Sequence, residues 1–375
     1  MDPDYQLLAL CACVECIPST RVKITSLVAE LTTWDGISTL AENNGMAPLL
    51  LAHLLSNGVP LPQAIRRELQ ALNLRHRFAH QARSSALQEI LQAFNQDEIC
   101  VLVLKGAALC RLLYPEPSLR PMSDIDLLLD SADLKRAEQI LNTLGYNTSS
   151  NDDPADEHRH IPPATKNISG FHISIELHHS LFDENSDGCL EQGRMDFKIL
   201  SADALPFEVE PGGLIAQALG FENMLYHLCR HLVDNNDGFG PMRLIWAADI
   251  IGFATRYQKE INWELLKKCY PLVLNTLALL NLLSPLSEDL IAILPGISDR
   301  LPVGIGQDYC GWPTVSLGRG RRSSYWRIIR DTFSPPEWWL RLRYGLGCRN
   351  RTGISLFKHT FHILKLAALH LKENQ

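Results

Sequence analysis

Two aspartates separated by one residue are the first feature of this sequence that could do chemistry. Asp124 and Asp126 lie in RPMSDIDLLLD, where the apolar run indicates a buried β-strand over 125–129. Alternate residues of a strand share a face, so both carboxylates should point the same way. Adjacent unpaired carboxylates repel each other, and a divalent cation that prefers oxygen ligands, Mg²⁺ or Mn²⁺, would relieve the repulsion. The pair therefore predicts a metal site.

A third carboxylate is expected on a neighbouring strand. In the segment FHISIELHH, residues 171, 173, 175 and 177 form an apolar face, whereas residues 172, 174, 176 and 178 form a polar one. Glu176 could therefore complete a three-carboxylate site, as a metal ligand and as the acceptor of a proton from an attacking hydroxyl group. His178 shares its face and is expected either to orient a substrate or to support the ligands.

A Lys-Gly turn supplies groups that suit phosphates. Lys105 and Gly106 follow an apolar run at 99–104, and a short helix is expected over 107–114. Gly106 permits a close backbone approach, and the first N–H groups of the helix can bind a phosphate. Lys105 and Arg120 could neutralise a triphosphate and stabilise a pyrophosphate leaving group.

Each of these patterns also occurs by chance, as a solvated strand end, an ordinary turn or a surface glutamate. Their order along the chain carries the prediction: strand, Lys-Gly turn, helix, arginine, D-x-D strand and a later strand with glutamate. Together they predict a site for a metal ion and a nucleotide.

The elements that must position these residues change in character along the chain. We predict a mixed α/β (α+β) fold: a small mixed sheet with helices, flanked by N-terminal and C-terminal helical regions. The predicted parts are a helical region (1–97), an α/β core (98–205), a helical domain (206–300) and a basic, Trp/Arg-rich region with a terminal amphipathic helix (301–375). A long helix is expected over 62–94, a hairpin near 158–165 and 171–178, and further helices over 132–144 and 213–233.

Composition excludes several classes of protein. The 375 residues are 46% apolar and 21% charged, which is typical of a folded globular protein. The net charge of −7 combines −16 over residues 1–317 with +9 from Gly318 onward. The N-terminus lacks the features of a signal peptide, and no apolar run reaches the length of a membrane span, so we predict a cytoplasmic protein without an integral span.

Other residues leave alternatives open. Cys11, Cys13 and Cys16 could bind a metal, or could be small buried thiols on an N-terminal helix. His227 and His231 have the spacing of a zinc pair on a helix, but they suit a cleft wall or a packed core as well. The basic region could bind an anionic acceptor such as RNA or an acidic peptide, or dock on the acidic body. Its terminal helix could pack on the body, bind a protein partner or lie on a membrane surface.

At the chemistry-bearing residues the sequence resembles a known family. The segment VLVLKGAALCRLLYPEPSLRPMSDIDLLL is similar to the signature of the uncharacterised nucleotidyltransferase family, within the DNA-polymerase-β-like superfamily. The residues that carry the likeness are L-K-G, the tyrosine before the turn and R-x-x-x-D-I-D-L-L. Further similarity lies in Trp34-Asp35 with NNGMAPLLLAHL, in the H-x-P…E-L-H pattern of residues 160–178, and in MLYHLCRHL and RLIWAAD. It extends over residues 34–251.

The resemblance implies an activity and a site. Asp124, Asp126 and Glu176 would be catalytic carboxylates, and Gly106 would belong to the phosphate-binding loop. The superfamily usually has Gly-Ser or Gly-Gly where this chain has Gly106-Ala107. The implied reaction is Mg²⁺-dependent transfer of a nucleoside monophosphate from an NTP, ATP being expected, with release of pyrophosphate. The acceptor could be a small molecule, peptide, protein or RNA. The alternatives are a catalytically silent nucleotide-binding module and kinase-like transfer of the terminal phosphate.

Overall fold

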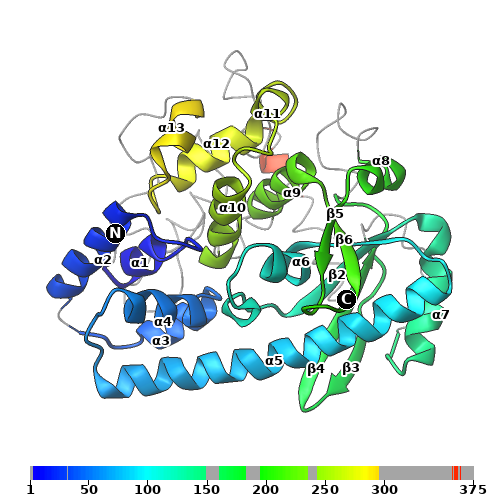
Figure 1. Ribbon diagram of the computed structural model, residues 1–375, viewed down its shortest axis with the longest axis horizontal. Coiled ribbons are helices and arrows are strands. Elements are labelled where there is room, and N and C mark those ends of the chain that lie inside the picture. Colours follow the sequence, from blue (N-terminus) through cyan, green and yellow to red (C-terminus); the bar gives the residue numbers. More distant parts are fainter. Residues whose placement is uncertain are drawn as a thin grey trace. The chain divides into compact units, whose positions relative to one another are not determined.

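The computed structural model describes residues 3–31, 33–148, 160–182, 195–234, 243–294, 357, 359–361 and 364 (Figure 1). The chain divides into two compact units. The first comprises residues Met1–Thr33, Leu228–Thr255 and Asn262–Gln375, and the second comprises Trp34–His227 and Arg256–Ile261. The predicted region 301–375 lies almost entirely outside the described residues, and the predicted division into four parts stays a prediction.

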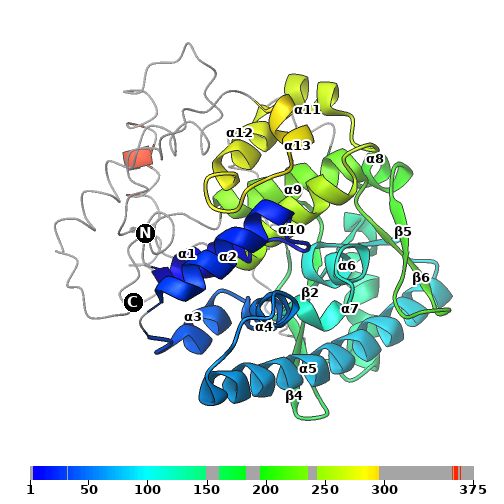
Figure 2. The same cartoon turned by 60° about the vertical axis from the view of Figure 1, so that its left-hand side comes forward.

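Where it is described, the first unit consists of helices. They are α1 (Pro3–Leu10), α2 (Pro18–Glu30), the C-terminal part of α9 (Phe221–Asp234), α10 (Leu244–Arg256), α11 (Trp263–Cys269), α12 (Pro271–Leu280) and α13 (Glu288–Ile293). Helix α1 packs against α2, and α11 packs against α12 (Figure 2). The side chains of α12 are mostly buried, as its apolar sequence predicts. None of the described helices of the chain combines the length and the apolar character that a bilayer crossing needs.

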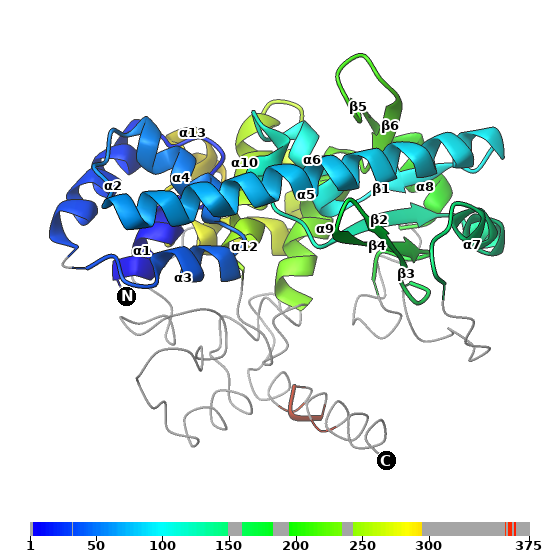
Figure 3. The ribbon, with the colours of Figure 1, turned by 90° about the horizontal axis from the view of Figure 1, so that it is seen from below.

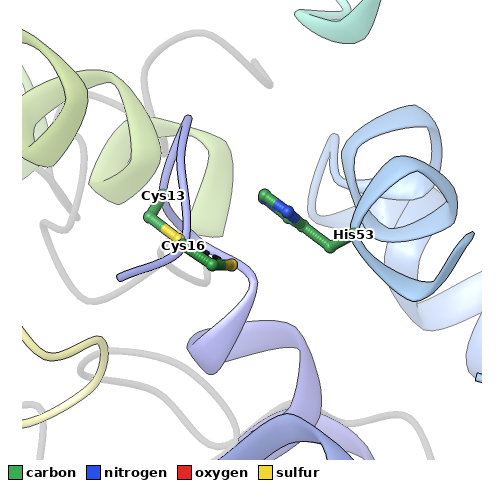
Figure 4. A group of neighbouring side chains, drawn as sticks. All are labelled: Cys13, Cys16 and His53. Carbon is green, nitrogen blue, oxygen red and sulfur yellow. Dashed lines mark hydrogen bonds between the residues drawn. The ribbon is translucent and has the colours of Figure 1, made fainter. Parts of the chain in front are cut away.

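The three N-terminal cysteines lie in the connection between α1 and α2, and the prediction that they lie on a helix is wrong. Helix α1 ends at Leu10, and Pro18 begins α2 because proline is tolerated in a first helical turn but not inside a helix. Cys13 Sγ lies 3.4 Å from Cys16 Sγ, the dashed contact in Figure 4. All three thiols are buried, and burial raises the pKa of Cys11, which keeps that thiol protonated.

A mixed sheet forms the centre of the second unit. Among the described residues it has six strands in the order β3-β4-β2-β1-β6-β5. They are β1 (Val101–Val103), β2 (Asp124–Leu129), β3 (Ala164–Ile168), β4 (Phe171–His178), β5 (Leu205–Glu208) and β6 (Ile215–Ala218). The pairs β2–β4 and β1–β6 are parallel and the other pairs are antiparallel. This sheet with its helices confirms the predicted mixed α/β fold, although β3 begins at Ala164, later than predicted.

Helices of the second unit include one that is far longer than the rest. Helix α5 (Gln63–Gln96) spans 34 residues and contacts α4, β4 and α7 (Figure 3). One face of α5 is buried, as the apolar periodicity over 62–94 predicts. The other helices of this unit are α3 (Ile37–Asn43), α4 (Ala47–Ser56), α6 (Lys105–Leu112), α7 (Leu134–Thr143), α8 (Phe197–Ala202) and the start of α9, with 3₁₀ turns η1 (Pro117–Leu119) and η2 (Ser131–Asp133).

The predicted helix over 213–233 is wrong in its first part. Strands β5 and β6 form an antiparallel hairpin before α9 begins at Phe221. In β6 the side chains of Ile215 and Gln217 are exposed whereas those of Ala216 and Ala218 are buried, which is the alternation of a strand. Alanine, leucine and glutamine favour helices locally, but pairing of β6 with β1 overrides that preference.

A polar cluster joins α5 to α6 and the β5–β6 turn. Arg111 on α6 forms an ion pair with Glu210, which also accepts a hydrogen bond from Ser84 on α5. His80, one turn earlier on α5, lies with its Nε2 atom 3.5 Å from Arg111 Nη2. Burial, and then the charge of Arg111, lower the pKa of His80 to about 4. The folded protein therefore keeps this imidazole neutral.

This neutral histidine predicts a loss of stability in mild acid. The unfolded chain binds a proton at His80 near pH 6.5, but the folded chain binds it only near pH 4. The contribution of His80 to the free energy of unfolding is complete above pH 6.5 and disappears as the pH falls to 4. It amounts to at most about 3 kcal/mol. The free energy of unfolding, measured by urea titration, should fall less between pH 7 and pH 4.5 in His80→Gln than in the wild-type chain. The matched variant His172→Gln, at an exposed position, should keep the wild-type loss; equal losses in all three proteins would contradict the assignment.

Candidate metal and nucleotide site

The predicted carboxylates share one face of two neighbouring strands. In the parallel pair β2–β4, Asp126 is opposite Glu176 and Asp124 is opposite Ser174. Because side chains alternate along a strand, Asp124, Asp126, Glu176 and His178 all project from the same face of the sheet. Ile125, Ile175 and Leu177 project from the opposite face and are buried in the core. The structure thus brings together groups that lie about fifty positions apart in the sequence.

Asp126 is the centre of this group. Its side chain is 3% exposed, and its Oδ1 atom lies 2.7 Å from Lys105 Nζ and 2.9 Å from His178 Nε2. Burial opposes ionisation of the carboxyl group, but Lys105 and the hydrogen bond from His178 outweigh it and hold the pKa of Asp126 well below its usual range. Asp126 is therefore a buried carboxylate that stays ionised.

The other two carboxyl groups have different electrostatic surroundings. Glu176 Oε2 lies 3.5 Å from His178 Nε2, and this interaction lowers the pKa of Glu176 against the opposing effect of burial. Burial, followed by repulsion from Asp126, raises the pKa of Asp124. A divalent cation between these groups would reverse the shift at Asp124, because it would replace repulsion by attraction.

The corner between β1 and α6 positions the side chains of Lys105 and Arg120. Lys105 has a φ of 43°, in the left-handed region that residues with a side chain rarely adopt. The backbone N–H of the preceding Leu104 donates to the carbonyl of Asp126 over 2.9 Å, which ties the corner to β2. The next residue is Gly106, and the buried guanidinium group of Arg120 lies against its Cα. The sequence assigned Lys105, Gly106 and Arg120 to the phosphates from separate segments, and the structure places Arg120 beside Gly106, the residue that follows Lys105.

Because Arg120 lies so close to Gly106, we expect any side chain at this position to lower the stability of the fold. A Cβ at position 106 would lie 2.1 Å from Arg120 Nη1 and 3.2 Å from Met122 Cβ, so the guanidinium group would have to move. We expect Gly106→Ala to lower the free energy of unfolding by about 1–3 kcal/mol. Chemical denaturation of the variant and of the wild-type chain measures this loss. The double variant Gly106→Ala with Arg120→Ala should lose less than the sum of the two single variants, and additive losses would contradict the clash.

The donor set fits a divalent cation. One ligand atom from each of Asp126, Glu176 and His178 lies within 4.8 Å of the other two. Carboxylate oxygens suit Mg²⁺ and Mn²⁺, and the ionised state of Asp126 removes the need to displace a proton there. Asp124 adds a further carboxyl group on the same face. The residues of this chain therefore fit the metal that the sequence predicts.

Two residues near the site were missed by sequence reasoning as site residues. The ring of His160 lies 5.0 Å from that of His178, centroid to centroid, and the positive charge that it can carry lowers the pKa of Glu176. The His-x-Pro pattern around His160 could have pointed to it. Arg83 on α5 interacts electrostatically with Asp124. Nothing in the helical pattern of α5 distinguishes Arg83 from its solvated neighbours.

The histidines with zinc-like spacing each contact an aromatic ring. His227 is buried, and its ring centroid lies 5.6 Å from that of Phe182 within the second unit. His231 packs edge to face on Trp246 within the first unit, at 5.0 Å. These contacts favour the packing role among the alternatives that the sequence left open.

Comparison with solved structures gives three matches, each of low sequence identity and low TM-score. The antibiotic-resistance factor ANT(2'')-Ia in solution is 15% identical, with a TM-score of 0.32 over 48% of this chain and 85% of that one. A crystal structure of ANT(2'')-Ia with adenylyl-2''-tobramycin is 14% identical, with a TM-score of 0.31 over 48% and 91%. An antigenic nucleotidyltransferase-like protein from Paracoccidioides brasiliensis is 18% identical, with a TM-score of 0.32 over 46% and 76%.

Comparison by sequence gives the family. No curated protein matches the chain. The model of one protein family matches residues 30–282, about two thirds of the sequence, and this match includes the whole carboxylate face and the Lys-Gly corner. It exceeds the range 34–251 over which the resemblance was recognised. The description of that family is uncharacterised nucleotidyltransferase, and the chain belongs to it.

Proposed function

We propose that this nucleotidyltransferase moves a nucleoside monophosphate from an NTP, ATP being the expected donor, to a nucleophilic acceptor. The observation that carries the proposal is the ionised, buried Asp126 with Glu176 and His178 around it on one strand face. The acceptor oxygen or nitrogen would form a bond to the α-phosphorus. The bond from that phosphorus to the oxygen that bridges to the β-phosphate would break, and pyrophosphate would leave with the electron pair.

Asp124, Asp126 and Glu176 would hold the metal, Mg²⁺ or Mn²⁺. When bound, the metal would supply positive charge that stabilises the phosphates during transfer. Glu176, with 21% of its side chain exposed, would accept the proton of the attacking group. Asp126 is too deeply buried and too strongly paired for that role.

The Lys-Gly corner would bind the phosphates. Helix α6 begins at Lys105, and its first N–H groups point out of the helix, where they can donate to a phosphate oxygen. The residue at the N-cap is Leu104, which has no polar side chain to satisfy them. Lys105 would keep Asp126 ionised before the metal binds and would neutralise phosphate charge afterwards. Arg120, beside Gly106, would add a second cation.

The test is transfer of label to an acceptor. The full chain is incubated with each α-phosphate-labelled NTP, Mg²⁺ and a cell extract, and any labelled species is identified by mass spectrometry. We expect an acceptor that has gained a nucleoside monophosphate. Gain of phosphate alone, with a γ-phosphate-labelled NTP, would replace the proposal by kinase-like transfer. Nucleotide binding without any release of pyrophosphate would favour a silent binding module.

A further inference from the structure

We propose that His178 is itself a metal ligand, through Nε2, and that the site consequently prefers Mn²⁺ or a similar nitrogen-accepting divalent ion to Mg²⁺. This inference rests on the proposed function only in placing a metal at the carboxylates. It assigns a nitrogen atom to a site that sequence reasoning described by oxygen atoms alone. His178 would then bind the metal directly, instead of orienting a substrate or supporting the ligands.

The register of the sheet directs His178 at the carboxylates. His178 follows Glu176 by two positions on β4 and pairs with Leu128, two positions beyond Asp126 on β2. Its Nε2 atom lies 2.9 Å from Asp126 Oδ1 and 3.5 Å from Glu176 Oε2. The ligand atoms of the three residues lie within 4.8 Å of one another, so one ion could contact all of them after small side-chain adjustments.

Burial fixes this orientation. The side chain of His178 is 2% exposed, so its ring cannot swing into solvent. Its Nδ1 atom is buried and has no hydrogen-bond partner among the described residues. Nε2 is therefore the ring nitrogen that faces the carboxylates, and it is the atom that a cation held among them would meet.

Lys105 already supplies a positive charge to Asp126. Lys105 Nζ lies 2.7 Å from the same Oδ1 atom that His178 approaches. A metal bound among these groups would take the place of the hydrogen bonds of His178, and Nε2 would then contact the metal instead of the carboxylates.

The nitrogen ligand sets the class of metal. Mg²⁺ binds oxygen ligands in a rigid octahedron and is seldom held by imidazole, whereas Mn²⁺, Co²⁺ and Zn²⁺ accept imidazole nitrogen together with carboxylates. A site that adds one imidazole to its carboxylates should therefore bind Mn²⁺ more tightly than Mg²⁺. That preference should fall by about tenfold or more when the imidazole is removed.

The test is pulsed electron paramagnetic resonance of Mn²⁺ bound to the full chain. The protein carries isotopically labelled imidazole nitrogens, and spectra are recorded with Mn²⁺ alone and with Mn²⁺ plus the non-hydrolysable α,β-methylene analogue of ATP. We expect the hyperfine coupling of a directly bound histidine nitrogen. It should vanish in His178→Gln and persist in His172→Gln, the matched control on the same face of β4, whose side chain is exposed. It should also persist in His160→Gln, which excludes the neighbouring ring.

Failure of this inference differs from failure of the proposed function. Mn²⁺ that binds the wild-type chain without histidine coupling, and is lost in Asp124→Asn with Asp126→Asn, would overturn the ligand role of His178 and leave the carboxylate site intact. Absence of Mn²⁺ binding by the wild-type chain, with and without nucleotide, would overturn both. If His178→Gln does not fold, as judged by circular dichroism, the wild-type spectrum and the His160→Gln spectrum still decide between these outcomes.

Discussion

Replacing Asp124 and Asp126 together by asparagine is expected to abolish nucleotide transfer, with a loss of at least about a thousandfold in rate, while the fold is retained. The reason is that both carboxylates lie on the one face of β2 where the proposed metal would bind, and asparagine keeps their shape but removes their charge. Losing the stabilisation of several kcal/mol that a bound metal gives to the transferring phosphate corresponds to such a factor.

The measurement is the initial rate of label transfer from an α-phosphate-labelled NTP, with circular dichroism to check folding. Asp97→Asn is the matched control, since Asp97 is an exposed residue that ends α5, and it should keep the wild-type rate. A double variant that transfers label at the wild-type rate would make the assignment of the two aspartates wrong. Replacing Asp126 by asparagine also leaves the largely buried Lys105 without its carboxylate, so a measurable loss of thermal stability is expected in addition.

The second large effect is expected at Glu176. Glutamine at this position can still accept a hydrogen bond from His178, but it can neither take a proton nor offer a charged ligand to a metal. Loss of a general base alone lowers rates by about a hundredfold to ten-thousandfold, so Glu176→Gln should lose at least about a hundredfold in the rate of transfer.

The same transfer assay, at several metal concentrations, separates the two roles of Glu176. If excess metal restores most of the rate, the carboxylate serves mainly as a ligand; if the loss persists when the metal site is saturated, it serves as the base. The control is Glu138→Gln on α7, a residue with no role in the proposed site. Wild-type rates at every metal concentration would contradict both roles.

The features that the sequence predicts correctly are those that arise within a single strand or helix. Alternation of polar and apolar residues placed Asp124 with Asp126, and Glu176 with His178, on single strand faces, because side-chain alternation is a property of one strand. The long α5 was predicted for the same reason, from a repeat that runs through the whole helix.

What could not be predicted depends on pairing between distant segments. The register that puts Asp126 opposite Glu176 is not visible in either strand alone. Strand β6 looks helical by composition, and only its partner β1 makes it a strand. Arg83 reaches the neighbourhood of Asp124 because of how α5 packs, which no short stretch of sequence encodes.

The position of β1 in the sheet has a consequence for how the chain is made. Strand β1 is flanked by β2, which follows it closely, and by β6, which is synthesised much later. Until Ala218 has left the ribosome, the nascent chain holds β1 with one row of N–H and C=O groups unpaired, an edge to which other strands can add. Long-range parallel pairing of this kind folds slowly. Truncations that end before β6 should therefore aggregate in the cell, even though they contain every carboxylate of the site.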